Sequence, residues 1–144
     1  MILIQEDTKP ELKNYRLLIS HSWKYSTQYD TIVNWLNLAS NFKWSNHSVS
    51  ADDPFSTKTK IALKEQLTQQ MRGCNAIIVV SGMYVGYSEW IDYEINEAIR
   101  MNKPIIAIKP WGNERIPLKI RNNATLIVGW NSMSLISAIR NYAL

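Results

Sequence analysis

Two short stretches of the chain carry the side chains best suited to chemistry. They are Ser20-His-Ser-Trp23 and Ser88-Glu-Trp-Ile-Asp-Tyr-Glu94, and an apolar run that predicts a buried strand precedes each of them. Trp90 and Glu94 are spaced i, i+4 near the start of a predicted helix, so they share one helix face. In an open α/β sheet this face would point to the carboxyl edge of the strands, where ligands bind. A carboxylate beside an aromatic ring and a polar turn would suit a site that cleaves a nucleotide.

Glu94 is the sharpest candidate because it lies off the core-facing stripe predicted for its helix. That stripe consists of Ile91, Ile95, Ala98 and Ile99. A carboxylate beside Trp90 at the ligand edge can lose solvent and gain basicity. A solvated glutamate paired with a lysine or arginine fits the spacing equally well. For Trp90 the spacing favours packing between helices over stacking on a nucleotide ring, because tryptophan is highly buried on average.

The turn after the first predicted strand offers hydroxyls and backbone amides that can bind a phosphate. His21 has no Asp or Cys partner at a recognisable spacing, so a catalytic triad is not predicted. We instead expect His21, Ser22 and Trp23 to contact a ligand or to stabilise the turn.

Two further places complete the set of candidates. Asp52 and Asp53 lie in a polar loop after the second predicted strand, where they could bind ribose hydroxyls. A solvated turn is the favoured alternative for this pair, since Pro54 biases Asp53 toward an extended backbone. Tyr84 precedes the helix of Glu94 and is either a ring contact or an ordinary turn aromatic.

Length and composition limit the class of protein. The chain has 144 residues, which fits a single domain. Its one cysteine, Cys74, precedes an apolar run and is predicted to be a small core residue. With only two histidines, no cluster of His and Cys is available, so no metal site is expected. The net charge of +4 comes from scattered lysines and arginines, so we expect no nucleic-acid partner.

The expected cellular compartment follows from the absence of two sequence signals. No stretch is apolar over the length that a membrane crossing needs, and the first residues lack the basic start of a signal peptide. We therefore expect a cytoplasmic protein with no membrane partner.

Strand and helix patterns alternate along the chain. Apolar runs predict strands at 15–20, 42–47, 75–81, 104–109 and 124–129. Helical spacing predicts helices at 29–39, around Leu63 to Met71 with Gly73 as the C-terminal cap, and from Ser88, as N-cap, to about Met101. Residues 82–87 are expected to form a turn, and a last helix is expected to begin at Asn131 or Ser132.

This alternation predicts an α/β domain with a parallel sheet and helices on both faces. Five strands suggest the flavodoxin-like order 2-1-3-4-5, whose switch point lies between the first and third strands. Those two strands are followed by the stretches Ser20–Trp23 and Ser88–Glu94. We expect residues 1–14 to form a lead-in and residues 15–144 to form the single domain. A phosphate-receiver domain is excluded, because Ser20-His-Ser22 and Ser81-Gly82 stand where its acidic residues would be.

Taken together, these residues resemble a TIR-like domain, in particular the short bacterial TIR-like proteins that include the Thoeris anti-phage sensor enzymes. The resemblance runs from about Tyr15 to the end of the chain. The stretches that carry it are Leu18–Trp23, Asp52–Pro54, Cys74–Val80, Gly82–Ile95, Lys103–Ile106, Pro110–Gly112 and Ile127–Asn131.

The resemblance implies that Glu94 cleaves NAD, with Trp90 as its companion in the W-x-x-x-E pattern. It also implies that the loops carrying His21, Ser22, Trp23, Asp52 and Asp53 wall the NAD site. A carboxylate would stabilise the oxocarbenium-like ribosyl centre left by nicotinamide. Water as acceptor would give ADP-ribose, whereas an internal or outside nucleophile would give a cyclic or conjugated signal molecule. NAD would then be a substrate, and no cofactor is expected.

The same resemblance implies further partners: a homo-oligomer, a phage-derived activator and a separate effector that senses the product. Two rival functions stay open. One is a non-catalytic TIR-like interaction module, and the other is an enzyme similar to nucleoside deoxyribosyltransferases, which use a glutamate on a similar fold.

Overall fold

The computed structural model describes residues 12–20, 26–49, 59–109 and 115–144, with the backbone alone for Ser26 and residues 83–88. Most of the predicted lead-in at 1–14 lies outside these ranges. Five strands form one sheet: β1 (Asn14–Ser20), β2 (Lys43–Asn46), β3 (Ala76–Val80), β4 (Ile105–Lys109) and β5 (Leu126–Gly129).

The sheet has the order β2-β1-β3-β4-β5, and every neighbouring pair is parallel. The predicted flavodoxin-like order is therefore confirmed. β1 and β3 are neighbours, with Ser20 of β1 in register with Val79 of β3. The point where the chain reverses its direction of travel across the sheet thus lies between these two strands, as predicted.

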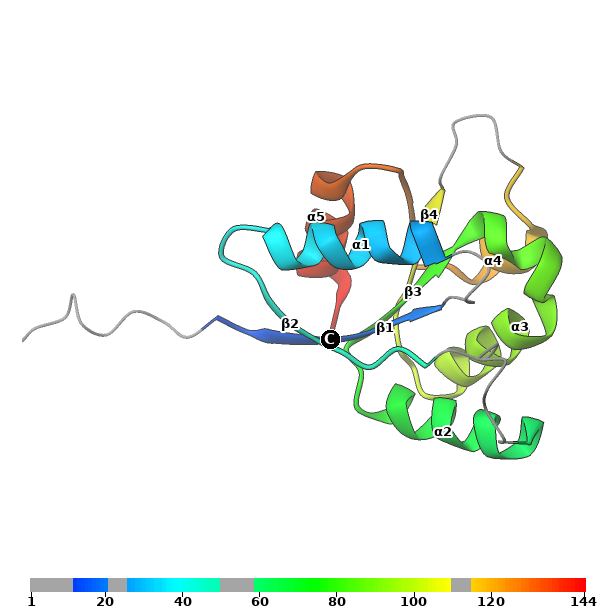
Figure 1. Ribbon diagram of the computed structural model, residues 1–144. Coiled ribbons are helices and arrows are strands. Elements are labelled where there is room, and N and C mark those ends of the chain that lie inside the picture. The colour runs from blue at the N-terminus through cyan, green and yellow to red at the C-terminus, as the bar shows by residue number, and fades with distance from the viewer. Residues whose placement is uncertain (1–11, 21–25, 50–58, 110–114) are drawn as a thin grey trace, which may run out of the picture.

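Helices cover both faces of the sheet (Figure 1). α1 (Ser26–Leu38) packs against α5 (Ser132–Tyr142) on one face, and α2 (Lys60–Arg72) packs against α3 (Tyr84–Arg100) on the other. The short α4 (Leu118–Asn123) contacts α3.

The core lies around β3. All of Ala76–Val80 is buried, because this central strand is covered by helices on both faces. Its continuous β-branched sequence suits such a position, where no face meets water. The third strand, predicted at 75–81, is thus confirmed and lies at the centre of the sheet.

Three helix ends have recognisable caps, and two of them, at Gly73 and Asn131, were expected from the sequence. The Thr59 side chain accepts a hydrogen bond from the amide of Ala62 at the start of α2, and Gly73 ends that helix. The Asn131 side chain accepts from the amide of Ser134 and caps α5. Of the two caps considered for the last helix, Asn131 is therefore the one observed.

The start of α3 differs from the sequence prediction. A single 3₁₀ turn, η3 (Ser81–Met83), runs directly into the helix at Tyr84. The turn predicted at 82–87 and the N-cap predicted at Ser88 are therefore wrong. Gly86 lies inside the helix, where a glycine costs only about 1 kcal/mol, and such a cost is easily outweighed by packing.

The core-facing stripe of α3 also differs in two residues. Ile91, Ile95 and Ala98 are buried as predicted, but Ile99 is 49% exposed. Glu94 is only 3% exposed. The reason is helical geometry, since positions 91, 94, 95 and 98 have the spacing i, i+3, i+4, i+7 of one face. Glu94 thus belongs to the buried stripe, and its predicted place beside that stripe is wrong.

Candidate functional site

The site is built around Glu94, a charged group placed in the core. Its carboxylate is hydrogen-bonded by the side chain of Ser20, the last residue of β1, which is 3% exposed. The carboxylate oxygen Oε2 has no hydrogen-bond partner among the described residues. Because Ser20 ends β1, Glu94 reaches the carboxyl edge of the sheet at the β1–β3 switch point, where ligands bind in this class of fold.

Burial changes the proton affinity of this carboxyl. Loss of solvent raises the pKa of Glu94 to about 7, and the hydrogen bond from Ser20 acts in the opposite direction by favouring the charged form. A carboxyl with this pKa changes its charge near neutral pH, which suits a general base, whereas an electrostatic role uses the ionised form that predominates above about pH 7.

Ser81 is a second buried polar group at the same edge. It follows β3 directly and is 1% exposed, and its hydroxyl has no hydrogen-bond partner in the described part of the chain. No sequence pattern singles out this serine as a site residue. Its position one residue beyond a central strand was the available signal, because side chains at strand ends line the ligand edge.

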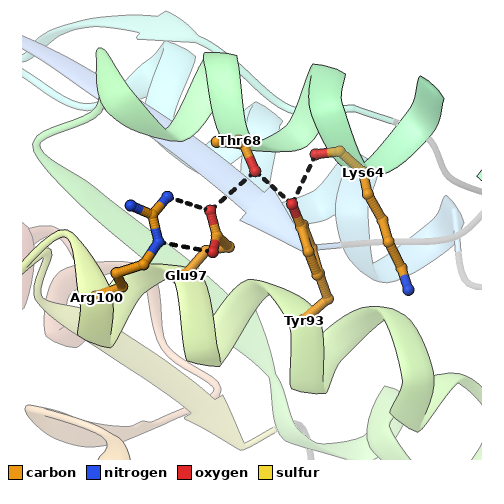
Figure 2. Close-up of polar contacts among 5 residues, drawn as sticks. All are labelled: Lys64, Thr68, Tyr93, Glu97 and Arg100. Atoms are coloured by element: carbon orange, nitrogen blue, oxygen red, sulfur yellow. Dashed lines mark hydrogen bonds and ion pairs between the residues drawn. The ribbon is translucent and has the colours of Figure 1, made fainter. Parts of the chain in front are cut away.

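A polar network fixes α3 against α2 (Figure 2). The Tyr93 hydroxyl donates to the carbonyl oxygen of Lys64 at 3.0 Å and also contacts the Thr68 hydroxyl. Thr68 in turn donates to Glu97 at 2.9 Å. Arg100 binds both carboxylate oxygens of Glu97 at 3.0 and 2.6 Å, and this pairing lowers the pKa of Glu97. Tyr93 and Glu97 flank Glu94 in the sequence, so the network fixes the rotation of the helix that carries it.

Trp90 has a packing role in the structure. It is partly buried against the hydrophobic core, and the Lys64 ammonium lies 6.0 Å from the centre of its ring. Lys64 is also 5.4 Å from the ring of Tyr93 and 3.9 Å from the carboxylate of Glu89. The packing interpretation of Trp90 agrees with these contacts, and its contact with a nucleotide ring stays a prediction.

Several predicted site residues are not placed by the structure. His21, Ser22, Trp23, Asp52 and Asp53 lie outside the described residues, and only the backbone of Tyr84 is described. Their meeting with Glu94 in one cleft therefore stays a prediction.

Other features of the described residues lie away from Glu94. A groove of about 660 Å³ runs between α1 and α5, and it is lined by none of the candidate site residues. Within the described ranges, no three His, Cys, Asp or Glu side chains gather as metal ligands. No described helix has both the length and the apolar character needed to cross a bilayer.

A parallel sheet in this order, with polar side chains gathered at its switch point, defines a flavodoxin-like α/β protein. A family model described as the TIR-like domain of Thoeris protein ThsB matches residues 18–115. The chain belongs to this family of Thoeris-type TIR-like proteins, and the resemblance drawn from its motifs is thereby confirmed.

One solved structure supports the fold independently. It is the Clostridium botulinum CMP N-glycosidase BcmB, which is 15% identical with a TM-score of 0.58. The similarity covers 88% of this chain and 99% of that one. At this level of identity the likeness concerns the fold alone. A search of curated proteins finds no match.

Proposed function

We propose that the chain is a TIR-like enzyme that breaks the N-glycosidic bond of NAD and releases nicotinamide. The observation that carries the proposal is Glu94: a buried carboxylate at the switch point, with one oxygen free of protein partners among the described residues. An isolated buried charge is costly, so a glutamate kept there with no basic partner among the described side chains is a candidate for function. Membership of the Thoeris TIR-like family supports the choice of NAD.

The proposed reaction requires few protein groups besides this carboxylate. Nicotinamide leaves NAD as a neutral molecule and needs no proton. The bond from its nitrogen to C1′ of the ribose breaks, and positive charge develops on the sugar. The ionised Glu94 then stabilises that charge in a site where water does not screen the interaction. Water or another nucleophile next forms a bond to C1′ and gives the product.

The acceptor decides what the product is. Because Glu94 is shielded from water, we propose that an internal or outside nucleophile competes with hydrolysis, which gives a cyclic or conjugated ADP-ribose derivative. In this proposal the product is a signal for a separate effector in cytoplasmic anti-phage defence. His21, Ser22, Trp23, Asp52, Asp53, Tyr84 and Trp90 would complete the binding site.

The direct test is product analysis. The purified protein is incubated with NAD, alone and with lysate of phage-infected cells, and released nicotinamide and the second product are identified by mass. Glu94→Gln is the matched control, since it removes the charge and keeps the shape. Release of nicotinamide by the wild type but not by this variant is the expected result.

The same assay separates the alternatives. BcmB is described as an N-glycosidase of CMP, so CMP and deoxynucleosides are tested beside NAD. Cleavage of CMP or a deoxynucleoside without cleavage of NAD would replace the proposed substrate. If no substrate is cleaved under any activating condition, a non-catalytic interaction module becomes the better description.

A further inference from the structure

Two buried polar atoms at the ligand edge lack partners in the described residues, and only one of them belongs to the proposed catalytic group. They are Oε2 of Glu94 and Oγ of Ser81. Buried polar side-chain atoms are satisfied in the large majority of cases, so each exception needs an explanation. The proposed reaction explains the unpaired oxygen of Glu94, but it gives no role to the hydroxyl of Ser81.

The sheet brings Ser81 close to the Glu94 carboxylate. Ser20, which hydrogen-bonds Glu94, pairs in register with Val79 on the neighbouring strand. Ser81 lies two residues beyond Val79. From the spacing of strands and residues, the Cα atoms of Ser20 and Ser81 are separated by a distance on the order of 8 Å. This is about the span of one sugar ring with its hydroxyls.

The two serines at these strand ends differ in what they bind. The Ser20 hydroxyl is used by the Glu94 carboxylate, whose Oε2 has no partner in the part of the chain that the structure describes. The Ser81 hydroxyl is unused among the described residues and can both donate and accept. An ionised carboxylate can only accept. Together, a free acceptor and a free hydroxyl complement neighbouring hydroxyl groups, which are the distinguishing feature of ribose.

A third unpartnered atom, Oδ1 of Asp92, does not belong to this set. Asp92 precedes Glu94 by two residues on α3, so its side chain points roughly 200° around the helix from that of Glu94. It therefore faces away from the edge at which Ser20 and Glu94 meet.

We propose that Ser81 is a substrate-binding residue whose hydroxyl hydrogen-bonds a ribose hydroxyl of the nucleotide while Glu94 faces the bond to be broken. The inference rests on the proposed function and adds a residue that selects ribose over sugars without these hydroxyls. Ser81 holds the sugar, and Glu94 acts on its C1′.

Binding to a cleavage-deficient protein tests this role without requiring turnover. Calorimetry measures NAD, and an NAD analogue lacking both hydroxyls on the nicotinamide ribose, against the Glu94→Gln protein and against Glu94→Gln with Ser81→Ala. The matched control adds Ser137→Ala, an exposed serine on α5, to Glu94→Gln. We expect Ser81→Ala to weaken NAD binding about tenfold, as for a lost hydrogen bond that leaves its partner unpaired. The affinity for the analogue should be unchanged, and Ser137→Ala should affect neither ligand.

The comparison of two ligands on one protein cancels any effect of the substitution on folding. Equal weakening of NAD and the analogue, or no weakening of either, overturns the role of Ser81. If either outcome is found and the wild type cleaves NAD, the role of Ser81 is lost but the proposed function stands. Selective weakening of NAD without wild-type cleavage supports Ser81 and contradicts the proposed reaction. If the Glu94→Gln protein binds neither nucleotide under conditions in which the wild type cleaves NAD, the role of Ser81 is overturned and the proposed function stands. Absence of both binding and wild-type cleavage contradicts both.

Discussion

At the scale of the residue, one carboxylate carries the proposed chemistry. Glu94→Gln keeps the size of the side chain and the hydrogen bond from Ser20 while removing the charge. We expect NAD cleavage to fall by about 10²–10³-fold or more, as commonly seen when one preorganised electrostatic partner is removed. Nicotinamide release under conditions that activate the wild type measures this effect. Wild-type turnover by the variant would show that Glu94 has no catalytic role.

The raised pKa of Glu94 predicts the pH dependence of cleavage. The reaction needs the ionised carboxylate, and burial raises the pKa of Glu94 to about 7. We therefore expect kcat/KM to rise with pH up to about 7 and then to level off. A series of rate measurements from about pH 5 to about pH 9 checks this. A profile that is flat through pH 7 would contradict the proposed ionisation.

The raised pKa of Glu94 also predicts how the free energy of unfolding changes with pH. The unfolded chain releases the Glu94 proton near its ordinary pKa of 4.5, whereas the folded protein holds it to about 7. The free energy of unfolding therefore falls as pH rises between these values, by up to about 3 kcal/mol from this group. We expect Glu94→Gln to be more stable than the wild type at pH 8 and to lose this advantage near pH 4. Denaturant titrations of both proteins at the two pH values measure the difference.

At the scale of the element, α3 depends on its contacts with α2. Tyr93→Phe removes the hydroxyl that bonds the Lys64 carbonyl and contacts Thr68. We expect a loss of about 1–2 kcal/mol in the free energy of unfolding, because these partners lose a hydrogen bond in a partly buried place. Tyr142→Phe on α5, a residue 44% exposed, is the control and should change stability by less than about 0.5 kcal/mol. Equal stability of the two variants would mean that the network does not hold α3.

The elements also show what the sequence could predict. The order of strands and the central place of Ile77 to Val80 follow from apolar runs separated by helical patterns, because that alternation leaves few topologies. Helix α4 was not predicted, since it has six residues and only Ile120 is buried in it. The local signals of Gly82 and Ser88 did not locate the start of α3, because glycine and serine are also tolerated within a helix at a small energetic cost.

For the candidate site, the sequence indicated Glu94 and the helix that carries it, but not the environment of the side chain. Trp90 and Glu94 stand out by type and spacing. The burial of Glu94 could not be predicted, because a glutamate in an otherwise apolar stripe is assigned to solvent by default. Its contact with Ser20 depends on two strands brought together by the fold, and no local pattern encodes it.

At the scale of the whole molecule, the burial of Glu94 controls access to the candidate site. Glu94 is 3% exposed in the single chain, so a substrate can reach it only after some rearrangement. We expect weak turnover by the dilute monomer and activation by assembly or by an infection signal. Nicotinamide release per molecule is measured over a range of protein concentrations, with the oligomeric state followed by light scattering. Full activity of a dilute monomer without any activator would contradict this prediction.

The pairing of β1 with β3 has a consequence for how the protein acquires activity. Ser20 and Glu94 meet only after two strands have joined across a long stretch of intervening chain, with β2 and two helices between them. Contacts of this kind form late, since closing a long loop costs entropy before the contact returns any stability. A chain emerging from the ribosome would thus have no assembled site until α3 has been made and packed. The proposed cleavage of NAD would in this way be absent while the chain is still being synthesised.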